Sequence, residues 1–434
     1  MFHDGIRKLK QQAAGDLAEW LDYISAQHSR EIELGLGRLR QLANRLELKP
    51  FSCPLITVAG TNGKGSSITA LEKFYTAAGY RTGCYTSPHL TVFNERIRVA
   101  SVFASDDEIC DAFSRIDSVR GDIPLTYFEF ATLAAFIIFS QSKLDIVLLE
   151  VGLGGRLDAT NLFPADLALI TSIGIDHTDW LGSDRETIAV EKAGIIHAGK
   201  IAVIADPEPP KSLLSIANDK ADKVFILNQD YSCDRNLDGW WWTSTDKKLS
   251  DLPFSGLHGI LQFNNLAGVL MSITALQDRL PISDVTIRTA LPKVKLQGRF
   301  QVIAGRPLVI LDVSHNPDSV ALLAENLQQQ DVAGKTHAVV AMLKDKDIVE
   351  SLKNIISSID YWYFAGLDVS RGENPEVLNA VLKKLHPAGN SQVYADVNEA
   401  WDDALEQAGD DDRIVVFGSF HTVGVILERL NLNI

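Results

Sequence analysis

The sequence predicts an α/β protein of two domains, the first built on a mostly parallel sheet and the second Rossmann-like. Short, almost wholly apolar segments alternate with helical segments along the 434 residues, as in parallel sheets that helices cover on both faces. The alternation is interrupted near residues 292–298 and then starts again. We therefore predict an N-terminal domain over residues 1–295 and a C-terminal domain over residues 296–434, each long enough to bury a core of its own.

In the N-terminal domain, apolar residues at helical spacing predict helices within residues 17–48, with a glycine-containing loop at 32–38 between them. Residues 60–66 form a glycine-rich turn, and the segment that follows predicts a helix that ends at Gly79. Four short apolar runs predict parallel strands at residues 55–60, 144–152, 166–174 and 200–207.

Between residues 222 and 258 the pattern changes to short alternating stretches, which predict hairpins at a sheet edge. We interpret residues 240–242, three consecutive tryptophans, as part of a covered β-ribbon. The strand–helix alternation then returns, with predicted strands at 306–312, 337–343, 361–366 and 413–417.

Composition and charge exclude several classes of protein. The 41 Lys and Arg against 56 Asp and Glu give a net charge of −15, which argues against a nucleic-acid partner or a basic face for membrane docking. The four cysteines are far apart and form no CxxC pair, as is typical of a reducing compartment. No secretory signal is recognisable, and the longest apolar run is far shorter than the roughly 18–20 residues that span a bilayer. We expect a cytoplasmic protein, and the charge favours a monomer.

The turn at residues 60–66 carries the strongest local signal. It joins a strand to a helix N-terminus, where backbone N–H groups and the helix dipole form an anion cradle. Lys64 adds a positive charge, and the Ser66 hydroxyl can hold Mg²⁺. Gly60 and Gly63 enclose two residues instead of the four of a strict Walker A motif. We therefore predict a P-loop-like ATPase domain, against the alternative of a glycine turn with a solvated lysine.

Three charged or titratable residues follow later strands. Glu150 ends a buried strand, at the sheet edge where α/β proteins bind ligands, and its carboxylate is a candidate Mg²⁺ ligand. His177 follows the next strand; alone it would be a structural hydrogen-bonding residue, but the neighbouring Glu150 and phosphate loop favour a catalytic role. Lys192 is either a surface lysine or a lysine held near the metal site.

Two residues of the C-terminal half are expected to face this site across a cleft. Asp312 follows an apolar strand and either contacts a nucleotide or caps a turn. Arg299 lies at the predicted domain boundary, from which its guanidinium could reach a triphosphate.

Eight segments, in order and across nearly the whole chain, resemble the folylpolyglutamate synthase family of the Mur ligase superfamily, in particular its bifunctional bacterial members with dihydrofolate synthase activity. These segments are GTNGKGS, TSPHL, LTYFEFATL, EVGLGGRLDATN, TSIGIDHTDWLG, EKAGI, QGRFQ and DVSHNP. The resemblance implies an ATP-dependent amide ligase that forms an acyl phosphate from a folate carboxylate, which the amine of L-glutamate then attacks. Its substrates would be ATP, L-glutamate, dihydropteroate and reduced folates.

The resemblance also implies roles for individual residues. Lys64, His177 and Lys192 would be catalytic, and Lys192 matches a lysine that is carbamylated in such enzymes and so helps to bind a second Mg²⁺. The implied nucleotide-binding residues are Thr61, Asn62, Gly63, Lys64, Asn265, Arg299 and Asp312, with Asn264 as a rival of Asn265. The implied metal ligands are Ser66, Ser87, Glu150, His177 and Lys192. The implied pterin-binding residues are Glu33, Leu34, Gly35, Thr126, Tyr127, Phe128, Glu129, Leu157, Asp158 and Ala159. His315, Lys346 and His421 are candidates near incoming glutamate.

Three alternatives stay open at this stage. The first is a folylpolyglutamate synthase without the dihydrofolate synthase activity, which the intact segments around Gly35 and Thr126 disfavour. The second, a peptidoglycan-precursor ligase, would leave the pterin-side segments unexplained. The third is a catalytically inactive, nucleotide-binding regulatory relative, which would be expected to have lost at least one of four residues that are all present: Lys64, Glu150, His177 and Lys192.

Overall fold

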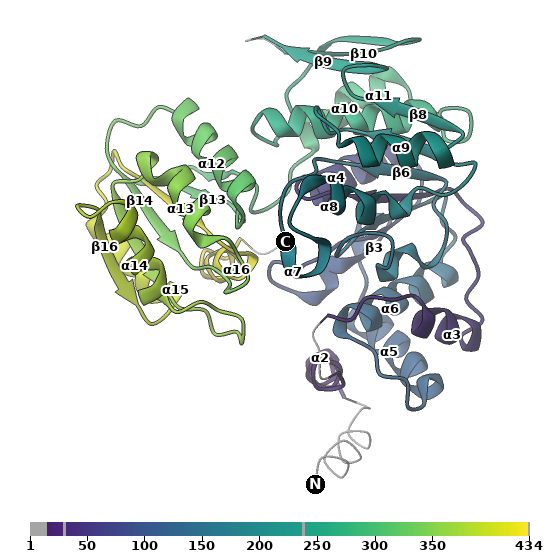
Figure 1. The fold of residues 1–434 in the computed structure, drawn as a ribbon, viewed down its shortest axis with the longest axis horizontal. Helices are drawn as coiled ribbons and strands as arrows, with labels where there is room; N and C mark the ends of the chain where they lie inside the picture. Colours follow the sequence, from purple (N-terminus) through teal and green to yellow (C-terminus); the bar gives the residue numbers. More distant parts are fainter. Residues whose placement is uncertain (1–14, 29–31, 237–238, 433–434) are drawn as a thin grey trace.

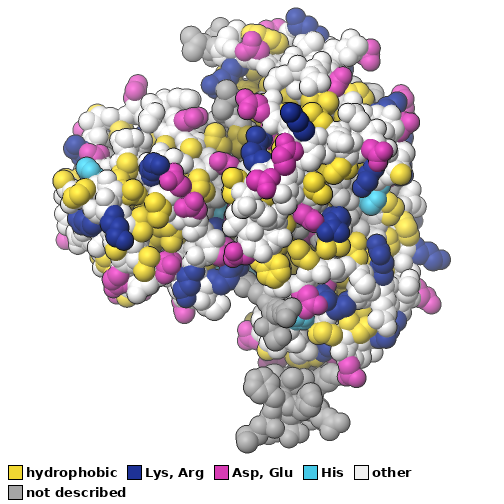
Figure 2. All heavy atoms as spheres, viewed as in Figure 1, with side chains coloured by type: hydrophobic (Ala, Val, Ile, Leu, Met, Phe, Trp, Pro, Cys, Tyr) yellow, Lys and Arg dark blue, Asp and Glu magenta, His cyan; other side chains and the backbone are white. Residues whose placement is uncertain are grey.

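The computed structural model describes residues 15–28, 32–236 and 239–432, and these fold into two α/β bodies that lie side by side (Figure 1). The larger body contains an eight-stranded and a three-stranded sheet, and the smaller body a six-stranded sheet. Acidic and basic side chains are interspersed over the face seen in Figure 2, and a groove separates the two bodies there. Within the described residues, no helix is long and apolar enough to cross a membrane.

The eight-stranded sheet has the order β4-β3-β2-β5-β1-β6-β7-β8. Six neighbouring strands from β2 to β8 run parallel, and β3 and β4 extend one edge in antiparallel fashion. The mostly parallel sheet that the sequence predicts is therefore confirmed. The strands are β1 Leu55–Ala59, β2 Thr82–Tyr85, β3 Ile97–Val99, β4 Val102–Phe103, β5 Ile146–Glu150, β6 Leu167–Ile170, β7 Ile201–Ile204 and β8 Lys223–Ile226.

Helices cover both faces of this sheet, because alternate side chains of each strand point to opposite faces. Ile56 and Val58 of β1 pack with α4 and α10, whereas Leu55 packs with α5 and α6 on the other face. The nearly continuous apolar runs of the strands follow from this burial on both sides. The helices of the larger body are α2 Leu17–Ala26, α3 Gly37–Arg45, α4 Lys64–Ala77, α5 Asp106–Arg120, α6 Tyr127–Gln141, α7 Thr178–Leu181, α8 Arg185–Lys192, α9 Lys211–Lys220, α10 Ile260–Ala275 and α11 Asp284–Ala290.

The tryptophan-rich segment forms a separate sheet of β9 (Tyr231–Arg235), β10 (Trp240–Ser244) and β11 (Lys248–Leu252). Trp240 and Trp242 are fully buried, and the indole N–H of Trp242 donates to the Ala267 carbonyl of α10 at 3.1 Å. The prediction of a covered ribbon is therefore confirmed. The prediction of hairpins is wrong for the first part of residues 222–258, because β8 pairs in parallel with β7 and forms an edge of the large sheet.

The six-stranded sheet of the smaller body has the order β12-β13-β17-β14-β15-β16, with β12 antiparallel and the others parallel. It agrees with the predicted Rossmann-like domain. The boundary at 295/296 remains our prediction, and it falls between the last helical turn before the sheet and β12. The elements are β12 Gln301–Ile303, β13 Leu308–Leu311, α12 Pro317–Gln329, β14 Thr336–Val340, α13 Ile348–Ile355, β15 Tyr361–Ala365, α14 Pro375–Leu385, β16 Asn390–Tyr394, α15 Val397–Gln407, β17 Arg413–Phe417 and α16 Phe420–Arg429.

Candidate active site

The carboxyl ends of three adjacent strands bring the predicted site residues to one edge of the large sheet. β1 pairs with β5 on one side and with β6 on the other. The phosphate loop follows β1, Glu150 ends β5, and the segment that leads to His177 follows β6. Ligands bind at this edge of open α/β sheets.

The loop after β1 is shaped as a cradle at the N-terminus of α4. Gly63 caps this helix with a φ of 93°, a left-handed conformation that suits glycine, and no side chain caps the helix. Thr61 fixes the loop to the segment after β6, because its N–H donates to the Ser172 carbonyl at 2.7 Å. Lys64 Nζ donates to the carbonyls of Gly60 and Thr61 at 3.0 and 3.1 Å. Burial lowers the pKa of Lys64, and an anion in the cradle would offset that loss of solvation.

The side chains beside the loop fit a hard divalent cation. The Ser66 hydroxyl is buried and has no hydrogen-bond partner. The Glu150 carboxylate is buried nearby: a Cβ added to Gly65 would lie 3.6 Å from its Oε1. Its Oε2 accepts the Ser87 N–H at 3.2 Å. Burial raises the pKa of Glu150, and the Lys64 charge opposes that rise. A hydroxyl without a partner and a buried carboxylate are hard oxygen ligands of the kind that Mg²⁺ prefers.

Lys192 lies beneath the phosphate loop. Its Nζ donates to the Gly60 carbonyl at 2.8 Å, and only 5% of the residue is exposed. Burial, with a smaller contribution from the Lys64 charge, lowers the pKa of Lys192 to about 7. The alternative of a surface lysine is therefore wrong. Near neutral pH a large fraction of this amine is uncharged and nucleophilic.

His177 follows β6, and β1 lies between that strand and β5, which ends at Glu150. His177 precedes α7 with a φ of 53°, and its Nε2 lies 4.0 Å from the Asp176 carboxylate. Burial lowers its pKa to about 4, so that the imidazole is neutral at physiological pH and able to act as a ligand. The charges of Glu150 and Asp176 both act on Lys64, and each opposes the fall in its pKa.

One cavity joins the phosphate loop to the smaller body. Its walls include Asn62, Gly63 and Ser66 from one side and Arg299 and Asp312 from the other. Arg299 interacts with both Asp312 and Glu150, and its guanidinium stacks 5.0 Å from the Phe420 ring. The structure therefore brings together most of the predicted nucleotide-binding residues across the groove between the bodies.

Asn265 lies against the phosphate loop. A Cβ added to Gly63 would meet its side-chain oxygen at 2.4 Å, so a larger residue at position 63 would displace it. Asn265 is 1% exposed, and its Oδ1 has no hydrogen-bond partner, whereas Asn264 is partly exposed. A buried, unpaired acceptor beside an anion cradle favours Asn265 over its neighbour for the predicted role.

The three predicted pterin-side segments meet at one place. The Gly35 N–H donates to the Leu157 carbonyl at 3.2 Å. Arg38 joins the segment of Glu33 and Gly35 to the segment of Glu129, since its guanidinium pairs with Glu33 and lies 2.8 Å from Glu129 Oε1.

The aromatic residues of this region are held firmly in place. Thr126 caps α6, with Glu129 in a reciprocal capping box. The Phe128 ring lies so close to Gly152 that a Cβ there would meet it at 2.5 Å, and the Arg96 guanidinium stacks 5.4 Å from the Tyr127 ring. Asp158 accepts the Leu153 N–H at 2.8 Å and caps the turn that begins at Ala159.

Sequence reasoning missed Asp176 as the hub between the two bodies. Its carboxylate accepts from Lys346 Nζ at 2.9 Å and Asn316 Nδ2 at 3.1 Å, and His315 lies 3.7 Å away. Burial disfavours its ionisation, but Lys346 and the two histidines outweigh that effect and hold its pKa well below the usual range. The only signal in the sequence is its place directly before His177.

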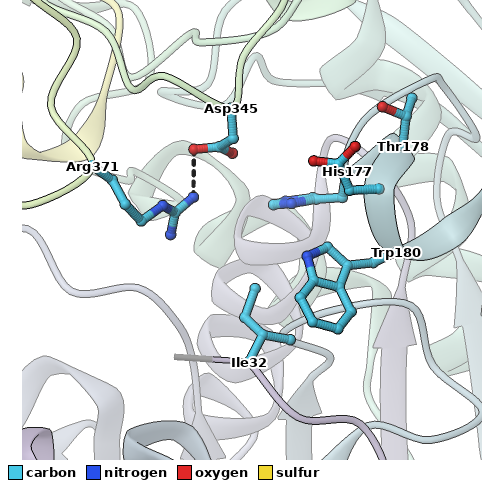
Figure 3. A pocket seen from close by; sticks show the side chains of 7 residues that line it. Ile32, His177, Thr178, Trp180, Asp345 and Arg371 are labelled. Carbon is cyan, nitrogen blue, oxygen red and sulfur yellow. Dashed lines mark hydrogen bonds and ion pairs between the residues drawn. The ribbon is translucent and has the colours of Figure 1, made fainter. Parts of the chain in front are cut away.

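A second cavity of about 360 Å³ opens beside His177 (Figure 3). The His177 and Trp180 side chains line one side, and Ile32, just before the pterin-side segment, lies near the Trp180 ring. Asp345 and Arg371 of the smaller body face them and form an ion pair of 2.6 Å. This cavity therefore also has walls from both bodies.

Comparisons with known proteins agree with this geometry. Residues 298–420 match the family "Mur ligase, glutamate ligase domain". The dihydrofolate synthase/folylpolyglutamate synthase of Escherichia coli (strain K12) is 41% identical, over 98% of this chain and 98% of its own. A structure of E. coli FolC in complex with DHPP and ADP has a TM-score of 0.90, 41% identity, and coverage of 97% of this chain and 99% of its own.

A second solved structure contains a bound metal ion and an amino acid as well as a nucleotide analogue. It is a bifunctional folylpolyglutamate synthase/dihydrofolate synthase with Mn, AMPPNP and L-glutamate bound, with a TM-score of 0.88, 42% identity, and coverage of 96% of this chain and 99% of its own. These relatives are similar to the chain over nearly their whole length. The chain therefore belongs to the dihydrofolate synthase/folylpolyglutamate synthase family of ATP-dependent amide ligases.

Proposed function

We propose that the protein ligates L-glutamate to dihydropteroate, forming dihydrofolate, and to reduced folates, forming folylpolyglutamates. The observation that carries the proposal is the shared groove, in which the phosphate loop faces Arg299 and Asp312. The pterin-side Phe128 lies against Gly152, two residues after Glu150. The carboxylate of the acceptor attacks the γ-phosphorus of ATP, giving an acyl phosphate and ADP. The amine of glutamate then attacks the acyl carbon, and inorganic phosphate leaves.

The main physical barrier to the first step is repulsion between two anions. The cradle after β1 and Lys64 would hold the phosphates, and Arg299 would approach them from the smaller body. Ser66 and Glu150 would hold magnesium, which supplies positive charge between the phosphates. Asn265, with its unpaired buried oxygen, would contact the nucleotide.

Lys192 has a further role in the proposal. An amine with a pKa near 7 reacts with carbon dioxide, because only the uncharged form is nucleophilic. The product, a carbamate, is an anion, and together with His177 it would hold a second Mg²⁺. We expect Lys192→Ala to lose most ligation, and bicarbonate not to restore it, since alanine has no amine to carbamylate.

The pterin-side cluster supports the bifunctional activity over polyglutamylation alone. Glu33, Arg38 and Glu129 form a connected charged group where Tyr127 and Phe128 present aromatic surface for a flat heterocycle. The neighbouring cavity between His177 and Arg371 lies between this cluster and the smaller body. We propose that the acceptor reaches from the aromatic residues toward the phosphate loop.

The test is one incubation with ATP, Mg²⁺ and L-glutamate, divided between dihydropteroate and tetrahydrofolate as acceptors. Product mass and ADP release are measured for the wild type and for Glu150→Gln as a control with equal volume and no charge. A gain of one glutamate with both acceptors supports the proposal. A gain with tetrahydrofolate alone restricts the protein to polyglutamylation, and ATP binding without any gain would favour the regulatory alternative.

A further inference from the structure

The loop of residues 86–92 touches both bodies of the protein. At one end the Ser87 N–H donates to the Glu150 carboxylate at 3.2 Å. At the other end Leu90 packs against the core of the smaller body. There its carbonyl approaches α16 so closely that a Cβ on Gly424 would lie 2.3 Å away. α16 lies on the side of the smaller body that faces the larger one (Figure 1). One short loop therefore connects the metal side of the site to the second domain.

The Glu95 carboxylate determines the shape of this loop. Its Oε2 accepts the Leu90 N–H at 2.8 Å. Its Oε1 accepts the N–H groups of Thr91 and Val92 at 2.7 and 2.8 Å and the Thr91 hydroxyl at 2.9 Å. Glu95 is 7% exposed, so these contacts replace nearly all of its hydration. Bonds from N–H or O–H donors to a buried carboxylate are among the stronger hydrogen bonds in proteins.

The start of the loop is held from the phosphate-loop helix. Glu72 of α4 forms an ion pair with Arg98, with an Nη2–Oε2 distance of 3.0 Å. Arg98 Nη1 donates to the Thr86 hydroxyl at 3.1 Å and to the Glu95 carbonyl at 2.7 Å. The loop is thus fixed to α4 at its beginning and to the Glu95 carboxylate at its end.

We infer that Glu95 is a positioning residue: it holds the 86–92 loop so that Leu90, seated in the smaller body, and Ser87, beside Glu150, move together. The inference rests on the proposed function, because it assigns Ser87 and Glu150 to the metal. A change in domain orientation would be transmitted along the loop to the Ser87–Glu150 contact. The ion would bind well only when the domains are set for ligation.

The test compares Glu95→Gln and Leu90→Ala with the wild-type full chain. Mn²⁺ affinity is measured by electron paramagnetic resonance in the presence of AMPPNP, and kcat for ligation in parallel. We expect the Kd for Mn²⁺ to rise about tenfold in Glu95→Gln, as when the outer partners of a metal ligand are removed, and kcat to fall. Leu90→Ala acts through the same loop, so the double variant should lose less than the product of the two single effects.

Asp412→Asn is the matched control. Its carboxylate also accepts backbone N–H groups, including that of Gly409 at 2.7 Å, but it precedes β17 at the opposite end of the strands from the site. This variant should lower the free energy of unfolding and leave the Kd for Mn²⁺ unchanged.

Unchanged Mn²⁺ affinity in folded Glu95→Gln, or independent effects in the double variant, would overturn the inference. If Glu95→Gln does not fold, Thr91→Val is used in its place. It removes one of the four donors to the Glu95 carboxylate and should give a smaller rise in the Kd for Mn²⁺. An unchanged Kd in Thr91→Val would also overturn the inference. Mn²⁺ and AMPPNP binding needs neither folate nor glutamate. A wild type that binds them without ligating would therefore refute the proposed function separately.

Discussion

Replacing Lys192 with methionine should abolish ligation and, at pH 7, stabilise the protein. The side chain is buried, and its pKa falls from the usual 10.5 to about 7, first because burial removes the hydration of the ammonium and second because of the Lys64 charge. Methionine has a similar length and no charge to solvate. Burial of the Lys192 ammonium therefore destabilises the folded protein, and the substitution removes this destabilisation.

The size of the effect follows from proton binding. Between pH 7 and 10.5 the unfolded chain keeps the Lys192 proton longer than the folded protein, so the free energy of unfolding rises with pH across this window. The cost to the folded state is about 4 kcal/mol at pH 7 and about 2 kcal/mol at pH 9. The hydrogen bond to the Gly60 carbonyl offsets about 1 kcal/mol. Lys192→Met should therefore gain about 3 kcal/mol at pH 7 and about 1 kcal/mol at pH 9.

Urea unfolding of both proteins at pH 7 and pH 9, in buffers free of carbon dioxide, measures this difference. Carbon dioxide is excluded because a carbamate would replace the amine. Lys200→Met is the control for removing a lysine charge outside the site, since the Lys200 ammonium is partly exposed and pairs with Asp166 at 3.0 Å. A Lys192→Met variant that is destabilised equally at both pH values would refute the reasoning.

Three further substitutions test other parts of the site. Gly63→Ala should weaken AMPPNP binding about tenfold in calorimetry, whereas Gly79→Ala, with a φ of 92° and open space around it, should share the backbone strain without the loss of binding. Asp176→Asn should lower the free energy of urea unfolding by about 3 kcal/mol, because Lys346 loses its buried partner, and a change below the error of the measurement would contradict this. Arg38→Met should raise the KM for dihydropteroate in steady-state assays and leave the KM for ATP unchanged; equal changes in both would argue against a pterin-side role.

Local residue patterns are sufficient to predict the strands that are buried on both faces and the loops that turn sharply. The apolar run at 144–152 predicts β5, because a strand covered on both sides has no polar face to interrupt the pattern. The glycines around Lys64 predict the cradle before α4, since the left-handed backbone at Gly63 disfavours other residues. The partly exposed β16 has no apolar run of this kind, and no strand is predicted there.

The tertiary structure decided which side chains meet. Asn264 and Asn265 are equivalent by sequence, and only the packing of α10 against the phosphate loop turns Asn265 toward Gly63. Nothing in the sequence distinguishes Asp176 from other acidic residues. It makes a contact between the domains because Lys346, 170 residues further on, lies 2.9 Å from its carboxylate. The sequence by itself determined the fold class, the family resemblance and the phosphate loop, because these depend on neighbours along the chain. Contacts across the groove depend on how two separate sheets lie against each other, and residue spacing carries no information about that arrangement.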